Sequence, residues 1–89
     1  MIPKERIPFV FEALGDQTRL KIFQLLAQKK DLCVTDIAKI FKISVPATSY
    51  QLKIMEVVGL VEKERMGKMI CYGLRKKDPL IKSIMRIIL

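Results

Sequence analysis

Residues 44–61, SVPATSYQLKIMEVVGLV, change character halfway along. The first half is small and hydroxyl-rich, carries no formal charge and has a proline near its start, whereas the second half is apolar at helical spacing and stops at Gly59. Serine is a preferred N-cap, proline is tolerated in a first helical turn, and glycine commonly follows a last turn. The stretch therefore predicts a helix over residues 45–58, capped by Ser44.

A shorter helix is expected directly before it. Thr35 can cap the segment DIAKIFK, residues 36–42, whose apolar side chains share one face. Only Ile43 separates this segment from Ser44. Two helices joined by so short a turn form a helix-turn-helix unit, here over about residues 35–58.

Caps, glycines and periodicity delimit the rest of the chain. The LCV segment, residues 32–34, is too short for more than a strand fragment. Three further helices are expected over about residues 4–14, 17–28 and 78–89; Asp16 caps the second of these and Asp78 the last. A β-hairpin, the wing, is expected over about residues 60–74, with Gly67 at its tip. We predict one domain over residues 1–89, mainly α with a small hairpin, a winged helix-turn-helix of order α-α-α-α-β-β-α.

Composition bounds the function. A net charge of +8 on 89 residues suits a polyanionic partner. The chain has no histidine, which removes the commonest general base and transition-metal ligand, and it has no nucleophile motif or glycine-rich phosphate loop. We therefore expect no enzyme and no cofactor. Two cysteines make no disulfide framework, and no signal peptide or span of about 20 apolar residues is present, so we expect a cytoplasmic protein without a membrane segment.

The front of the helix over 45–58 has the properties of a base-reading surface. On a helical wheel Leu52, Met55 and Val58 face the core together with Thr48, and the small residues point away. In helix-turn-helix proteins the first residues of the second helix meet base edges in the major groove, where hydroxyl and small apolar side chains suit hydrogen bonds and thymine methyl groups. The residues assigned to DNA contact are Ser44, Val45, Pro46, Thr48, Ser49, Tyr50, Gln51 and Lys53 on this helix, Lys42 before it, and Lys63, Arg65 and Lys68 on the hairpin.

The chain resembles the ArsR/SmtB family of prokaryotic winged-helix transcriptional regulators over about residues 9–75. ALGDQTRLKI resembles the ALGDPTRLRI-type opening of the family, DLCVTDIA its ELCVCELA-type segment, and SxxxxSxQLKxMxxxGLV its S-x-x-x-x-S-x-H-L-x-x-L-x-x-x-G-L-V pattern. The resemblance implies a homodimer paired through its first and last helices, and two recognition helices on a palindromic operator. Most such proteins repress transcription until an effector releases them. The interface residues implied are Ile7, Phe9, Val10, Leu80, Ile81, Ile84, Met85, Ile87 and Ile88.

Two departures from the family pattern concern the recognition helix and the metal sites. Gln51 replaces the usual histidine, and glutamine can still bond DNA or form a local cap. The thiolate site of the family uses both cysteines of a CVC motif, which is CVT here, so Cys33 remains and Thr35 does not ligate. The other family site uses histidines and carboxylates on the last helix, where only Asp78 is present. We expect no metal site, and the sequence names no effector.

The two cysteines have different expected environments. We expect Cys33 to be a small buried hydrophobe. Cys71 alternates with Ile70 and Tyr72, which we expect to point inward, so Cys71 is expected at the surface, either as a redox-sensitive thiol or as a bystander.

Two alternatives to a DNA-binding regulator stay open. A winged-helix protein-interaction module would use the same basic patch on acidic protein surfaces. The amphipathic segment 79–89, with Lys82 and Arg86 on its polar side, could lie on a membrane surface, although burial in a dimer explains its apolar face more simply.

Overall fold

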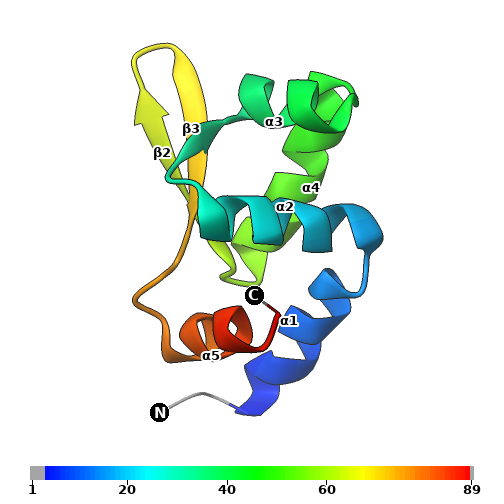
Figure 1. Ribbon diagram of the computed structural model, residues 1–89, viewed down its shortest axis with the longest axis vertical. Coiled ribbons are helices and arrows are strands. Elements are labelled where there is room, and N and C mark those ends of the chain that lie inside the picture. Colours follow the sequence, from blue (N-terminus) through cyan, green and yellow to red (C-terminus); the bar gives the residue numbers. More distant parts are fainter. Residues whose placement is uncertain (1–3, 89) are drawn as a thin grey trace.

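The computed structural model describes residues 4–88; residues 1–3 and 89, the last position of the predicted C-terminal helix, lie outside it. The described chain has five α-helices, a 3-10 turn and a three-stranded antiparallel sheet, which confirms the predicted winged helix-turn-helix fold (Figure 1). The elements are η1 (Lys4–Arg6), α1 (Ile7–Leu14), α2 (Gln17–Gln28), β1 (Leu32–Cys33), α3 (Val34–Phe41), α4 (Val45–Val57), β2 (Val61–Met66), β3 (Met69–Leu74) and α5 (Pro79–Ile88). Within residues 4–88 no helix has the length and apolarity that a bilayer span requires.

Short polar side chains start three of the helices where the sequence predicts them. Asp16 accepts the backbone N–H of Arg19 at 3.0 Å, and Asp78 accepts that of Leu80 at 3.0 Å. Ser44 likewise caps α4 by accepting a backbone N–H at 3.1 Å. Each cap satisfies a donor that the first helical turn leaves without a partner.

The predicted start of α3 is wrong by two residues. The N-cap is Cys33 rather than Thr35, and the helix begins at Val34. The carboxylate of Asp36 accepts the backbone N–H of Cys33 at 3.2 Å, so the chain closes into a helix as soon as β1 ends. The acceptor for the Cys33 N–H is thus the carboxylate three residues later, the spacing of a capping box.

The sheet has the order β1-β3-β2, so β3 is its central strand. The hairpin pairs Val61 with Leu74 at its base and Met66 with Met69 at its tip, and Gly67 makes the turn with a φ of 64°. The two residues of β1 pair with the other edge of β3, which gives the predicted strand fragment its place. As a result, the base of the wing is joined to the start of α3.

A single apolar core lies beneath the two-helix unit. Its fully buried members come from every helix and from the sheet, and include Val10, Ile22, Phe23, Leu26, Ile37, Leu52, Met55, Leu60, Val61 and Ile81. Burial of a side chain of this size stabilises the fold by about 1.5–3 kcal/mol. The core therefore fixes which side of α4 faces inward.

Arg6 joins three elements that are distant in sequence. Its Nε donates to the carbonyl of Val58 at 3.3 Å, its Nη2 donates to that of Gly59 at 2.9 Å, and its guanidinium pairs with Asp78. Gly59 has a φ of 80°, and an added Cβ there would lie 2.8 Å from Arg6 Nη2. Arg6 thus bonds the end of α4 and the start of α5.

The pKa of Asp78 is set by opposing effects. Burial alone would raise it, but the hydrogen bond from Arg6, the N–H of Leu80 and the charges of Arg6 and Arg75 lower it below its ordinary value of 3.8. A carboxyl group with a lowered pKa stabilises the fold above its unfolded pKa, and this contribution is lost as the pH falls through the folded pKa.

We predict that Asp78→Asn lowers the free energy of unfolding at pH 7 by about 1 kcal/mol, because asparagine keeps the cap but loses the ion pair. Urea denaturation of both proteins between pH 7 and pH 2 checks this. The difference should hold from pH 7 down to about pH 4 and then vanish as the native carboxyl protonates. If the two proteins still differed as much in their free energy of unfolding at pH 2, the charge of Asp78 would not be the cause of the difference.

Candidate nucleic-acid interface

A tight turn sets α4 against α3. Lys42 ends α3 in the left-handed conformation, with φ 57° and ψ 41°, and is exposed. Two residues later Ser44 caps α4, and Pro46 lies in its first turn, where no hydrogen bond is lost. This geometry leaves the first turn of α4 at the surface.

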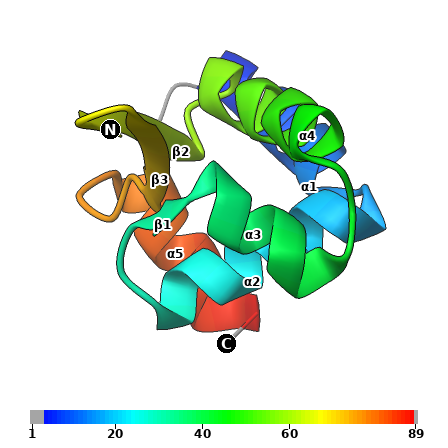
Figure 2. The same ribbon diagram turned by 90° about the horizontal axis from the view of Figure 1, so that it is seen from above.

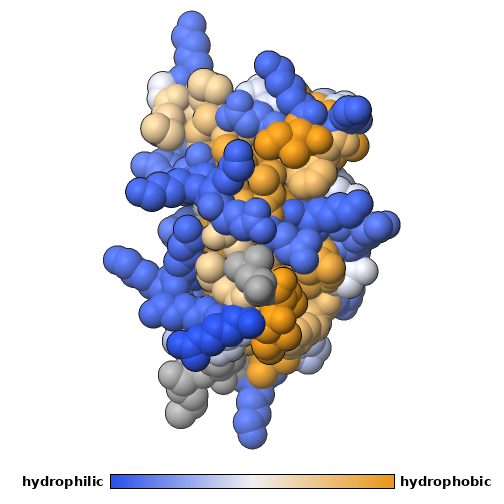
Figure 3. All heavy atoms as spheres, in the orientation of Figure 1, coloured by the Kyte–Doolittle hydropathy of each residue, from blue (hydrophilic) through white to orange (hydrophobic). Residues whose placement is uncertain are grey.

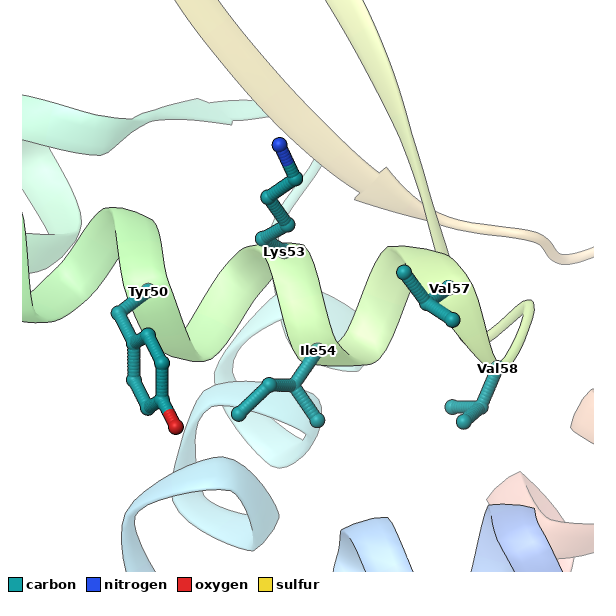
Figure 4. Close-up of a pocket in the computed structure, with 5 residues that line it drawn as sticks. All are labelled: Tyr50, Lys53, Ile54, Val57 and Val58. Carbon is teal, nitrogen blue, oxygen red and sulfur yellow. The ribbon is translucent and has the colours of Figure 1, made fainter.

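The outward face of α4 is small and uncharged at its start. Val45, Ser49 and Lys53, four residues apart, are all exposed, and so are Pro46 and Tyr50. Figure 4 shows Tyr50 and Ile54 pointing to one side of the helix and Lys53 to the other. An apolar groove of about 270 Å³ follows this half of α4, lined by Tyr50, Lys53, Ile54, Val57 and Val58.

Thr48 is a correction to the predicted DNA contacts. It has no exposed surface, and its hydroxyl donates to the carbonyl of Ser44 at 2.9 Å. The helical wheel placed Thr48 on the core side, and the core packing of α4 keeps it there. Its assignment as a DNA contact is therefore wrong, and it supports the first turn from within.

Gln51 is half-buried and points toward α2. Its Oε1 accepts a hydrogen bond from Arg19 Nη1 at 2.7 Å, and Arg19 Nε donates to the carbonyl of Ala13 at 2.7 Å. Arg19 thus links α4 to the end of α1 through two hydrogen bonds. Sequence reasoning assigned no role to Arg19 or Arg6, because a surface arginine and a bridging arginine look alike without the fold.

The two faces of the wing carry opposite charges. Lys63 and Arg65 share a face with the core residue Val61, whereas Glu62 and Glu64 lie on the other face. The core face of the sheet is the one turned toward the helices. The positive side chains of β2 therefore lie on the side of the wing that faces α4.

A groove of about 240 Å³ separates the wing from α4. Seen from above, the hairpin and α4 stand on either side of the start of α3 (Figure 2). The recognition helix contributes Val45 and Ser49 to the groove, and the wing contributes Lys68 and Ile70. The uncharged start of α4, the groove and the basic hairpin therefore form one continuous surface.

Burial raises the pKa of Tyr72 at the base of the wing, and the negative charge of Glu56 raises it further.

The expected environments of the cysteines are reversed. Cys71 has only 1% of its surface exposed, while Cys33 is half-buried and lines the groove beside α4. The two are bridged by a disulfide, so neither is a free thiol. Cys33, bonded to Cys71 from the neighbouring strand β1, is its direct cross-strand partner, and strand alternation alone does not show this pairing. Among residues 4–88, no three potential ligands of the His, Cys, Asp and Glu types gather at one place.

The predicted dimer residues divide into two groups. Val10, Leu80, Ile81 and Ile84 are at most 6% exposed and belong to the core of the protomer, so their assignment to an interface is wrong. The exposed or half-buried members are Ile7, Phe9, Met85, Ile87 and Ile88, and Phe11, 52% exposed, was missed although its position opposite the core on the wheel was available. Apolar atoms reach the surface where α1 and α5 lie, at the end of the molecule opposite the wing tip (Figure 3).

Comparison with known proteins agrees with this geometry. The family described as "Bacterial regulatory protein, arsR family" matches residues 16–63. A cadmium resistance transcriptional regulatory protein, a CadC homolog of Staphylococcus aureus, is 37% identical over 65 residues, 73% of this chain and 54% of that protein, so the chain spans about half the length of this relative. An uncharacterized HTH-type transcriptional regulator of Methanocaldococcus jannaschii is 32% identical over 84 residues, 94% of this chain and 92% of that protein.

A solved structure extends the likeness to three dimensions. The homodimeric winged helix-turn-helix DNA-binding domain of a possible ArsR-family transcriptional regulator from Mycobacterium bovis superimposes with a TM-score of 0.82 at 26% identity, covering 94% of this chain and 75% of that one. The family match covers more than half of the sequence and includes the two-helix unit with its capped α4. On this sequence match and this fold, the chain belongs to the ArsR family of bacterial regulatory proteins.

Proposed function

We propose that this protein is a homodimeric, sequence-specific DNA-binding regulator, a repressor in its basal state, which acts in the cytoplasm where the chromosome lies. The observation that carries the proposal is the uncharged start of α4 beside a wing whose lysines and arginine face the same side. Membership of a family of regulators supports it, and the named relatives are regulators rather than enzymes.

The proposed contacts divide by chemistry. Val45 and Ser49 reach base edges, because a methyl-bearing side chain suits thymine and a hydroxyl can donate or accept. The charged residues neutralise phosphates and carry no sequence information. The phosphate contacts we assign to each protomer are Lys42, Lys63, Arg65 and Lys68, all exposed.

The proposed dimer pairs α1 and α5 with their symmetry mates. Phe9 and Ile87 expose 62% and 77% of their surface at this end of the molecule. Large apolar side chains that are exposed together commonly mark a protein–protein interface. A two-fold axis there would present two copies of α4 to one face of a duplex, so the operator would be palindromic. The Mycobacterium bovis domain that this chain resembles is homodimeric, which supports this arrangement.

We predict a steep salt dependence of duplex binding. Four phosphate contacts in each protomer make eight in the dimer, which gives a slope of log K against log salt of about −7. Lys68→Ala should reduce this slope by about 2 and weaken all sequences alike. Fluorescence anisotropy between about 50 and 200 mM salt measures both. Lys30→Ala is the matched control, because Lys30 is exposed in the segment between α2 and β1 and is not one of the assigned phosphate contacts. Binding that barely changes with salt, or no duplex retained from genomic fragments, would favour the protein-interaction alternative.

We predict that substitution of Ser49 changes the DNA sequence preference, whereas substitution of Gln51 changes the stability of the fold. Ser49→Ala should relax sequence preference at one operator position by about 1–3 kcal/mol without loss of stability, because Ser49 is exposed and its hydroxyl forms no side-chain hydrogen bond within residues 4–88. Gln51→Ala should lower the free energy of unfolding by about 1 kcal/mol and leave the selected sequence unchanged, because its oxygen is bonded to Arg19. Selection from random duplexes, paired with urea denaturation, separates the two effects. A changed preference in Gln51→Ala would assign it to the bases.

We predict that Ile87→Glu weakens dimerisation by at least about 100-fold, because a two-fold interface loses the apolar surface twice and gains two buried charges. Sedimentation equilibrium measures the monomer–dimer constant. Met66→Glu is the control, since Met66 is also exposed, at 56%, but lies at the wing tip. An unchanged dimer in Ile87→Glu, or a disrupted one in Met66→Glu, would move the interface elsewhere.

A further inference from the structure

The disulfide occupies a particular place in the fold. Cys33 ends β1 and caps α3, Cys71 lies in β3, and the two are direct partners in the antiparallel register. The 37 residues between them contain all of α3, α4 and β2. The bond therefore closes a ring around the whole two-helix unit and fastens the base of the wing to the start of that unit.

Only one of the two sulfurs belongs to a residue that is open to solvent. Cys71 is 1% exposed, whereas Cys33 is half-buried and lines the groove between α4 and the wing, together with Ser49 and Lys68. A reagent must therefore reach Cys33, and the buried Cys71 can react only with Cys33. An accessible cysteine beside a buried partner is the arrangement expected of an attacking and a resolving thiol.

We propose that Cys33 and Cys71 form a reversible thiol–disulfide site, oxidised by a small-molecule disulfide and reopened by a dithiol. The Cys33 thiolate attacks one sulfur of the disulfide RS–SR, forms a mixed disulfide and releases one thiolate. The Cys71 thiolate then attacks the Cys33 sulfur, forms the protein disulfide and expels the second thiolate. Two protein thiols are oxidised and RS–SR is reduced to two RSH, with two protons passed to the leaving thiolates.

The redox state sets how firmly the wing is held. Without the bond, the strand pairing between β1 and β3 consists of two residue pairs, Leu32 with Tyr72 and Cys33 with Cys71. Such a short strand pair adds little by itself. With the bond, Lys68 and the other basic residues of the wing keep a fixed position relative to α4, which lowers the ordering cost of binding. This consequence for DNA rests on the proposed function, whereas the chemistry of the site does not.

The site itself is tested on the wild-type chain in oxidised and reduced glutathione. Alkylation followed by mass spectrometry should count no free thiols in oxidised glutathione and two in reduced glutathione. Adding dithiothreitol to the oxidised protein should restore both free thiols. The oxidised form should melt at least about 10 °C higher, because a ring of this size strongly restricts the unfolded chain. Cys33→Ala and Cys71→Ala should each abolish this response. Two free thiols in oxidised glutathione, or equal melting temperatures, would overturn the proposal.

Coupling to DNA is tested by anisotropy on a selected duplex. The oxidised wild-type protein should bind about three- to tenfold more tightly than the reduced one on every sequence, since the wing contacts phosphates. The Cys33→Ala/Cys71→Ala variant should match the reduced protein in both buffers. Equal affinity of both redox forms would refute control of the wing. If neither form binds any duplex, the proposed function fails, and the thiol count and melting temperature still decide the site.

Discussion

The rotation of α4 about its own axis is the constraint on which the rest of the structure depends. Leu52 and Met55 have no exposed surface, so the core fixes which side of the helix faces inward. Arg19 holds the middle of the helix through Gln51, and Arg6 holds its end through two carbonyls. If α4 were rotated about its axis by one residue, each side chain would change direction by about 100°. The small residues at the start of α4 would then be buried.

The proposed base-reading role accounts for the absence of charge at the start of α4. A long basic side chain there would keep the backbone of α4 away from a duplex, whereas Val45, Pro46 and Ser49 permit close approach. Long-range attraction does not depend on direction, so lysines and an arginine can supply it from the turn before α4 and from the wing. The split between neutral and basic elements follows from the different ranges of the two forces: short contacts discriminate and charges attract.

Local interactions were predictable and distant ones were not. Asp16, Ser44 and Asp78 cap helices as expected, because a cap involves residues two or three positions apart. The apolar periodicity of α1 and α5 was also correct, but a wheel cannot show whether an apolar residue meets its own core or a partner. Val10 and Ile81 were therefore assigned to the wrong surface. The pairing of Cys33 with Cys71 depends on two strands 38 positions apart, and no local pattern encodes it.

Arg6 connects the proposed dimer end of the molecule to the proposed reading helix. Its guanidinium donates to the carbonyls of the two residues that follow α4 and pairs with Asp78, which caps α5. Any shift of α5 against its symmetry mate would thus pull on the end of α4 through a partly buried charge pair, which resists separation more than an exposed one. In a two-fold dimer this connection would hold both copies of α4 at one spacing, and half-site spacing on a duplex is set by that distance. In the proposed dimer, the arginine that completes the fold of one protomer would therefore also affect the relative geometry of the two protomers.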